Sequence, residues 1–382
     1  MYYIEAQRTI GMKFLLMISH PAQFHMYRNI IGKLKEHSHQ VVIVIRPKDI
    51  LEQLCEEANV SFYKVKERSN KCGRLGYVIA FFSKIFSVMK IVRREKPDML
   101  AGCDGTIAYV GRILGLPSIG FTEDDYSIIK LYADIFFPVY NKVIIPYVCD
   151  AGKWNKKKIG YAGYQKLTYL HPNYFTPDKK VVEQYFPVDE SPYFIIRFAK
   201  LTAHHDVGVN GFSHEVAQRV IDKLKQHGRV FITSEAPLPQ EFEQYRLRIN
   251  PLDIHHLLAF ASLYIGDSQS MAVEASMLGT PCLRFNDFVG QKKISVLEEL
   301  EHVYHLTNGI HSSDADTLYQ RIDEILALSD ARAVYQARRQ QMLQDKIDVT
   351  KYWTWFLENY PASAVQHAEN DEFWKQFRGG RA

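Results

Sequence analysis

The residues best suited to chemistry stand in one run, 267–281, which reads Asp-Ser-Gln-Ser-Met-Ala-Val-Glu-Ala-Ser-Met-Leu-Gly-Thr-Pro. A strand-like segment, 263–266, precedes this run, and good helix formers follow its polar turn until a Gly and a Pro stop them. A strand, a turn and a helix start direct unpaired backbone N–H groups and a positive dipole end at one point. That arrangement suits a phosphate or diphosphate. The turn residues expected to hold it are Ser268, Gln269 and Ser270.

Glu274 lies one turn inside this predicted helix, within reach of the ribose hydroxyls of a nucleotide whose diphosphate sits at the helix start. The alternative is an ordinary serine cap on an α/β helix, with Glu274 as a solvated charge.

Two histidines follow the first predicted strand, in the segment His20-Pro21-Ala22-Gln23-Phe24-His25. Loops after parallel strands bind ligands in open α/β folds, and a histidine near its ordinary pKa is a good general base for an acceptor hydroxyl. We therefore take His25 or His20 as a candidate base. The alternative is a histidine that caps the following helix or packs beneath it.

Two carboxylates follow the next strands at the same edge: Asp104 comes after 99–101, and Glu123 comes after Ile119. Three segments thus converge on one site. The alternative is that Asp104 and the neighbouring Asp125 are turn and cap residues.

The second half of the chain offers cations at a matching place. Arg197 and Lys200 end a predicted strand, and His204 and His205 follow in the next loop. Cationic side chains there would offset the charge of a leaving diphosphate. A structural loop is the alternative. Adjacent histidines seldom share one ion, so no metal is predicted.

Residues 75–92 are rich in large apolar side chains and are flanked by Lys and Arg. Lys84 and Lys90 interrupt the stretch, which makes a membrane-spanning helix a poor interpretation. A core helix and a peripheral face for an anionic membrane remain the two interpretations.

Strand-like and helix-like segments alternate twice along the chain, as expected of an α/β protein with two doubly wound parallel sheets. We place an N-terminal Rossmann-like domain at 12–172, a C-terminal one at 190–350, and closing helices at 351–382. The aromatic side chains of the last segment must bury against something.

The composition is that of an ordinary globular protein, with 47% hydrophobic and 24% charged residues. A formal net charge of +4 and the lack of a known motif argue against nucleic acid as a partner. The five cysteines are scattered and odd in number, which favours reduced thiols in a cytoplasmic protein.

The run from Asp267 to Pro281 resembles the nucleotide-diphosphate segment of the non-hydrolysing UDP-N-acetylglucosamine 2-epimerases and, more loosely, the donor site of a lipid-linked N-acetylglucosaminyl transferase. Both belong to the glycosyltransferase-B superfamily. Most of the chain is similar to the domain-of-unknown-function 354 proteins, whose N-terminal pattern matches the segment from Ser19 to Arg28.

The resemblance implies a glycosyltransferase-B fold, in which two Rossmann-like domains face a cleft and the terminal helices cross back to the first domain. It implies a UDP-linked or other nucleotide sugar as substrate, a sugar or lipid-linked acceptor, no cofactor and no metal. A glycosyltransferase of surface polysaccharide or glycan synthesis is the first expectation. A sugar 2-epimerase, with Asp104 and Glu123 transferring protons, is the rival, and a non-catalytic nucleotide-sugar binder is the third possibility.

Overall fold

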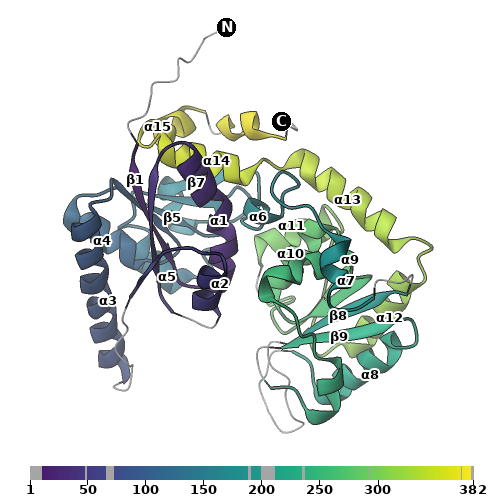
Figure 1. Ribbon diagram of the computed structural model, residues 1–382. Helices are drawn as coiled ribbons and strands as arrows, with labels where there is room; N and C mark the ends of the chain where they lie inside the picture. Colours follow the sequence, from purple (N-terminus) through teal and green to yellow (C-terminus); the bar gives the residue numbers. More distant parts are fainter. Residues whose placement is uncertain are drawn as a thin grey trace. The chain divides into compact units, whose positions relative to one another are not determined.

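The computed structural model describes residues 11–47, 50–65, 73–187, 191–198, 211–234, 237–291, 293–370 and 372–379. These residues form two compact units, each with a parallel sheet between helices (Figure 1). Unit 1 contains the described residues up to Tyr169 and from Ile347 onward, and unit 2 runs from Leu170 to Lys346.

The sheet of unit 1 has seven parallel strands. In spatial order they are β3 (Tyr63–Lys64), β2 (Gln40–Ile45), β1 (Lys13–Ile18), β4 (Met99–Gly102), β5 (Ser118–Phe121), β6 (Lys142–Pro146) and β7 (Lys158–Tyr161). In the central strand β1, Leu16 pairs with Ile43 of β2 and with Ala101 of β4, and all three are buried. Sheets buried on both faces favour such continuous apolar strands.

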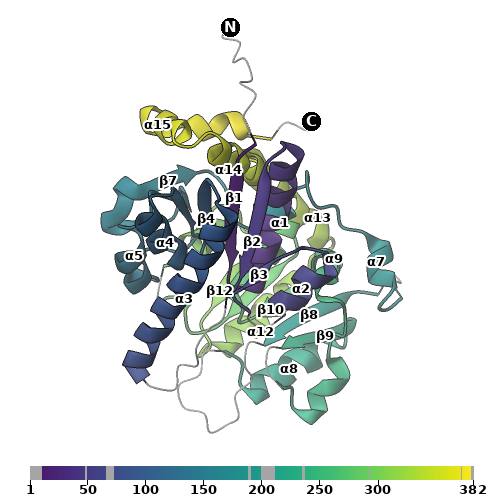
Figure 2. The same cartoon turned by 60° about the vertical axis from the view of Figure 1, so that its left-hand side comes forward.

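Helices cover both faces of this sheet. They are α1 (Pro21–Glu36), α2 (Leu51–Glu57), α3 (Gly73–Glu95), α4 (Thr106–Leu114), α5 (Lys130–Phe136), the short α6 (Leu167–Leu170), α14 (Val349–Glu358) and α15 (Ala362–Glu369), with 3₁₀ turns η1 (Gly152–Lys157) and η4 (Phe373–Phe377). Figures 1 and 2 show α3 and α4 on one face and α1 on the other. Pro21 favours the start of α1, because a proline in the first helical turn has no N–H group that would need a partner.

The C-terminal helices belong to unit 1, as expected, and α14 packs against α1. The indole of Trp353 is fully buried and stacks on Phe121 at the end of β5, with the ring centroids 4.2 Å apart. Thr350 Oγ1 also donates to the carbonyl of Thr168 at 2.7 Å. The end of the chain therefore supports the loops that follow β5 and β7.

Unit 2 repeats this architecture with five parallel strands. Their order is β12 (Asn308–Ile310), β11 (Cys282–Phe285), β10 (Leu263–Gly266), β8 (Tyr193–Phe198) and β9 (Arg229–Ser234). The helices and 3₁₀ turns are α7 (Lys179–Glu183), α8 (His214–Leu224), η2 (Gln240–Tyr245), η3 (Pro251–Asp253), α9 (Ile254–Phe260), α10 (Gln269–Leu278), α11 (Ser295–His302), α12 (Ala315–Leu326) and α13 (Ala331–Asp345). Apolar residues of α8 and α12 join those of the strands in one core, while α10 contacts α9 and α13.

Among the described residues, no helix is both long and apolar enough to cross a bilayer. The four described cysteines are free thiols, and in the same part of the chain no group of His, Cys, Asp and Glu side chains is arranged to hold a metal ion.

Candidate functional site

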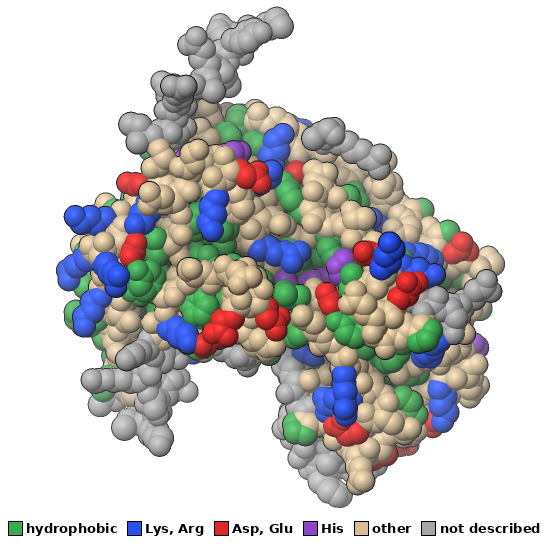
Figure 3. Space-filling view, in the orientation of Figure 1, with side chains coloured by type: hydrophobic (Ala, Val, Ile, Leu, Met, Phe, Trp, Pro, Cys, Tyr) green, Lys and Arg blue, Asp and Glu red, His purple; other side chains and the backbone are tan. Residues whose placement is uncertain are grey.

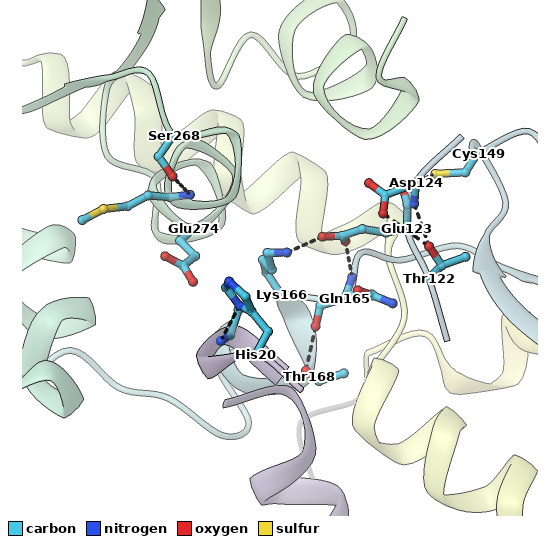
Figure 4. Close-up of polar contacts among 12 residues, drawn as sticks. His20, Thr122, Glu123, Asp124, Cys149, Gln165, Lys166, Thr168, Ser268 and Glu274 are labelled. Atoms are coloured by element: carbon cyan, nitrogen blue, oxygen red, sulfur yellow. Dashed lines mark hydrogen bonds and ion pairs between the residues drawn. The ribbon is translucent and has the colours of Figure 1, made fainter. Parts of the chain in front are cut away.

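The predicted strand–turn–helix run of unit 2 is present, with the strand and the stop at Gly279 as expected and the helix starting at Gln269 instead of after Ser270. β10 ends at Gly266, and Ser268 caps α10, with its hydroxyl accepting from the N–H of Met271 at 3.4 Å (Figure 4). A Cβ on Gly266 would lie 2.4 Å from the hydroxyl oxygen of Tyr264, so only glycine fits where the chain turns from β10 into this loop. The first-turn N–H groups of α10 are thus presented at the carboxyl edge of the sheet, where an anion is favoured.

The side chain of Gln269 is held within unit 2. Its amide nitrogen donates to Asn286 Oδ1 at 3.1 Å, and its oxygen accepts from Arg284 Nη1 at 3.4 Å. Arg284 in turn pairs with Glu301 at 2.5 Å, and both side chains are largely buried. We infer that Gln269 would offer its backbone N–H to a ligand, while its side chain braces the first turn. Ser270, the next residue, is half-buried at the same helix end.

Glu274 is not a solvated charge. Its side chain is 12% exposed and lies 3.5 Å from Nε2 of His255, which extends from α9 and is 2% exposed. The carboxylate thus stands one turn above the anion-favouring end of α10, held against a second helix.

Arg197 lies at the end of β8, in register with Gly266 of the neighbouring β10. Its backbone oxygen accepts from the N–H of Asp267, so the residue borders the turn into α10. Lys200, His204 and His205 fall in the segment 199–210, outside the described residues. Their expected contact with a diphosphate stays a prediction.

In unit 1, His20 caps α1 (Figure 4). Its Nδ1 accepts from the N–H of Ala22 at 3.2 Å, so the neutral ring must carry its proton on Nε2. The exposed edge of His20 is therefore a hydrogen-bond donor.

His25 lies inside α1 and is 7% exposed. Its ring packs 5.6 Å from those of Phe24 and Tyr169, measured between centroids. This placement matches the packing alternative for a histidine in this segment. Its role as the base stays a prediction.

Asp104 follows β4 and is 9% exposed. Its carboxylate accepts from Lys84 of α3 at 3.0 Å, from the Ser19 hydroxyl at 2.8 Å and from the Thr106 N–H at 2.9 Å. Burial alone would raise the pKa of Asp104, but the Lys84 ammonium and the Thr106 bonds more than offset it, and the pKa lies below its usual value. The carboxylate of Asp104 therefore bonds to residues of three segments: Ser19 after β1, Lys84 of α3 and Thr106 at the start of α4.

Glu123, in the loop after β5, forms an ion pair with Lys166 and accepts from the N–H of Gln165 at 3.0 Å (Figure 4). Lys166 itself is 6% exposed. The sequence analysis did not single out Lys166. Its position shortly after β7, at the carboxyl edge of the sheet, is the signal that points to it. Both side chains of this pair are largely buried, so the contact is internal to unit 1.

Asp124, directly after Glu123, has a pKa shifted in the direction opposite to that of Asp104. Poorly hydrated surroundings and the negative charge of Glu123 raise its pKa above the usual value, although the residue is exposed at the surface of the loop. Its N–H donates to the Thr122 hydroxyl at 3.2 Å. Asp125, by contrast, is 3% exposed and accepts from the N–H of Asp150 at 2.8 Å, which is a structural role.

A family model for the proteins of unknown function DUF354 matches residues 12–351. The chain belongs to this DUF354 family. Among curated proteins, none matches the chain in sequence.

Solved structures share the fold. The UDP-GlcNAc 2-epimerase of Methanocaldococcus jannaschii superposes with a TM-score of 0.59 at 11% identity, over 86% of this chain and 99% of that one. The UDP-GlcNAc 2-epimerase of Neisseria meningitidis, solved with UDP-GlcNAc, gives 0.57 at 13% identity over 87% and 99%. The calicheamicin glycosyltransferase CalG4 gives 0.55 at 12% identity over 95% and 98%. These likenesses confirm the glycosyltransferase-B fold.

Proposed function

We propose that the protein is a glycosyltransferase that uses a nucleotide-diphosphate sugar, as in glycan or surface polysaccharide assembly. The observation that carries the proposal is the start of α10, where the capped helix end and the half-buried Glu274 stand one turn apart. A diphosphate at the N–H groups and a ribose at the carboxylate would use both features. The likeness to an epimerase solved with UDP-GlcNAc supports UDP as the nucleotide.

The state of the unit 1 carboxylates favours transfer over epimerisation. An epimerase needs an acid and a base that each exchange a proton with the sugar ring. Asp104 is bonded to Lys84 and Glu123 to Lys166, and both carboxylates are largely buried. For Asp104, whose pKa is lowered, protonation would leave the largely buried ammonium of Lys84 uncompensated.

Asp124 is the better candidate for a general base. It is exposed in the loop that follows β5, at the carboxyl edge of the sheet, and its raised pKa makes it a stronger base than an ordinary aspartate. In the proposed step, Asp124 takes the proton of the acceptor hydroxyl as its oxygen bonds to the anomeric carbon. The bond from that carbon to the diphosphate breaks, and the nucleoside diphosphate leaves with the electron pair. Arg197 and the N–H groups of α10 would stabilise its charge.

The test is incubation with a panel of UDP-, GDP- and dTDP-linked sugars, with and without sugar or lipid-linked acceptors. Transfer releases nucleoside diphosphate only when a suitable acceptor is present. Appearance of a new nucleotide sugar without acceptor would establish the epimerase instead. Saturable nucleotide-sugar binding with neither product would establish a non-catalytic binder.

A further inference from the structure

The outer face of helices α3, α4 and α5 in unit 1 is unusually apolar. Of the large hydrophobic side chains that are exposed in the described part of the chain, half lie on these helices: Val78, Ile79, Phe82, Phe86, Ile113, Leu131 and Ile135. Phe82 and Phe86 are 54% and 60% exposed. The outer face of a surface helix is ordinarily polar, and a cluster of this kind marks an interaction site.

The three helices form one continuous surface. Beneath it, the ring of Phe81 packs against Tyr109 of α4 and Phe136 of α5, with centroids 5.6 and 5.8 Å apart. On its inner face α3 buries Ile85 and Val88 against the rest of the unit. The inner face of α3 is therefore part of the core, as the core-helix interpretation of its sequence predicted. Its outer apolar residues do not contribute to this core.

The first half of α3 extends past the sheet. Lys84 reaches Asp104 at the carboxyl end of β4, and the helix continues for eleven residues before Lys84, back to Gly73. At a rise of about 1.5 Å per residue this is roughly 16 Å of helix. Figures 1 and 2 both show α3 running beyond the strand ends. Val78 and Phe82 thus stand at the edge where the acceptor is expected.

Exposed cations accompany the apolar residues. On the same helices they are Lys90, Arg93, Arg94, Arg112 and Lys130. Both acidic residues of these helices are already paired, Glu95 with Lys13 at 2.8 Å and Asp134 with Lys153 at 2.9 Å. Figure 3 shows Lys and Arg beside hydrophobic side chains on the side of unit 1 where Figure 1 places α3.

We propose that the α3–α5 face of unit 1 docks on a bilayer that carries anionic lipids. The apolar side chains would enter the boundary between headgroups and acyl chains, and the cations would contact the lipid phosphates. Self-association fits less well, because a two-fold contact would set the exposed cations of one copy against those of the next. The proposal does not rest on the identity of the reaction.

The experiment is co-sedimentation of the full-length protein with vesicles of phosphatidylcholine alone and of phosphatidylcholine mixed with phosphatidylglycerol in equal parts. Wild type should bind the anionic vesicles, and added salt should weaken binding because it screens the cations. The variant Phe82→Ser/Phe86→Ser should bind about tenfold or more weakly for each ring removed. Lys90→Gln/Arg93→Gln should also bind more weakly and depend less on salt.

Matched controls replace equally exposed residues elsewhere. Val303→Ser/Val365→Ser and Lys179→Gln/Lys180→Gln should bind like wild type, and circular dichroism melts should show every variant folded. Wild type that ignores anionic vesicles would overturn the proposal, as would controls that lose as much binding as the α3 variants. A wild-type dimer that the Phe82→Ser/Phe86→Ser variant breaks, seen by sedimentation velocity without vesicle binding, would assign the face to a second copy instead.

Discussion

At the strand ends of unit 1, two carboxylates are bonded to buried or half-buried ammonium groups of the same unit, Asp104 to Lys84 and Glu123 to Lys166. At the strand ends of unit 2, the side chain of Gln269 bonds to Asn286, and the loop after β10 leads directly into the first turn of α10. The two carboxylates of the first edge are compensated by lysines of the same unit, whereas the helix start at the second edge favours a negative ligand. Under the proposed function, unit 2 would receive the anionic donor, and unit 1 would receive the acceptor hydroxyl and take its proton.

The largest effect on this comparison is expected when Asp124, the proposed base, is replaced. Asp124→Asn should lower turnover about 10²- to 10⁴-fold, the range of a general base, and should leave the affinity for UDP unchanged. Because the base must be deprotonated, wild-type kcat/KM should fall as the pH drops through the raised pKa of Asp124, and the variant should lack this limb. Asp150→Asn, at an exposed turn, is the control. Turnover within threefold of wild type would remove Asp124 from the mechanism.

The Glu123–Lys166 pair should be a stability element. Lys166→Met leaves a largely buried carboxylate unpaired and should lower the free energy of unfolding by about 3 kcal/mol. Urea denaturation measures this, and adding Glu123→Gln should recover part of the loss. Lys153→Met removes an exposed partner of Asp134 and should cost about 1 kcal/mol or less. Equal losses of unfolding free energy in Lys166→Met and Lys153→Met would contradict the distinction between the buried and the exposed ion pair.

The next prediction tests whether Glu274 of unit 2 contacts the nucleotide. Glu274→Ala should weaken UDP binding by about 1–3 kcal/mol, the scale of a hydrogen bond to a charged group, without unfolding the protein. Titration calorimetry provides the measurement, with Glu324→Ala on the exposed face of α12 as control. Unchanged affinity would exclude a ribose contact by Glu274.

The smallest effect concerns acid stability. The pKa of Asp104 is lowered in the folded state, so its pairing stabilises the protein fully above the unfolded-state pKa and is lost as the pH falls through the folded one. Wild type should therefore lose stability below about pH 4, the usual range for aspartate. Asp104→Asn should be less stable at neutral pH and show a flatter acid profile in thermal melts. Parallel profiles would show that the Lys84 contact contributes nothing to stability.

The sequence predicted best what local signals determine. The strand 263–266 and the stop at Gly279 depend on neighbouring residues, and both predictions are confirmed. The helix begins at Gln269, so two of the expected turn residues lie in its first turn and Ser268 is the cap that the alternative described. The pairing of Glu123 with Lys166 was not predictable, because the partners are 43 residues apart and meet only when β5 and β7 join one sheet.

Ambiguity remained where one residue type serves two purposes. His20 could cap a helix or act as a base, and only the bond from the Ala22 N–H decides which ring nitrogen carries the proton. The apolar stretch 75–92 could be core or surface, and α3 proves to be both: one face buries Val88 while the other exposes Phe86.

The central claim is that the start of α10 receives a nucleotide diphosphate. Titration of the wild-type protein with uridine, UMP and UDP by calorimetry tests it most directly. Each phosphate adds charge-assisted bonds to the helix N–H groups, so UDP should bind about tenfold or more tightly than uridine. Equal affinity for uridine and UDP, or no binding of UDP at all, would contradict the account.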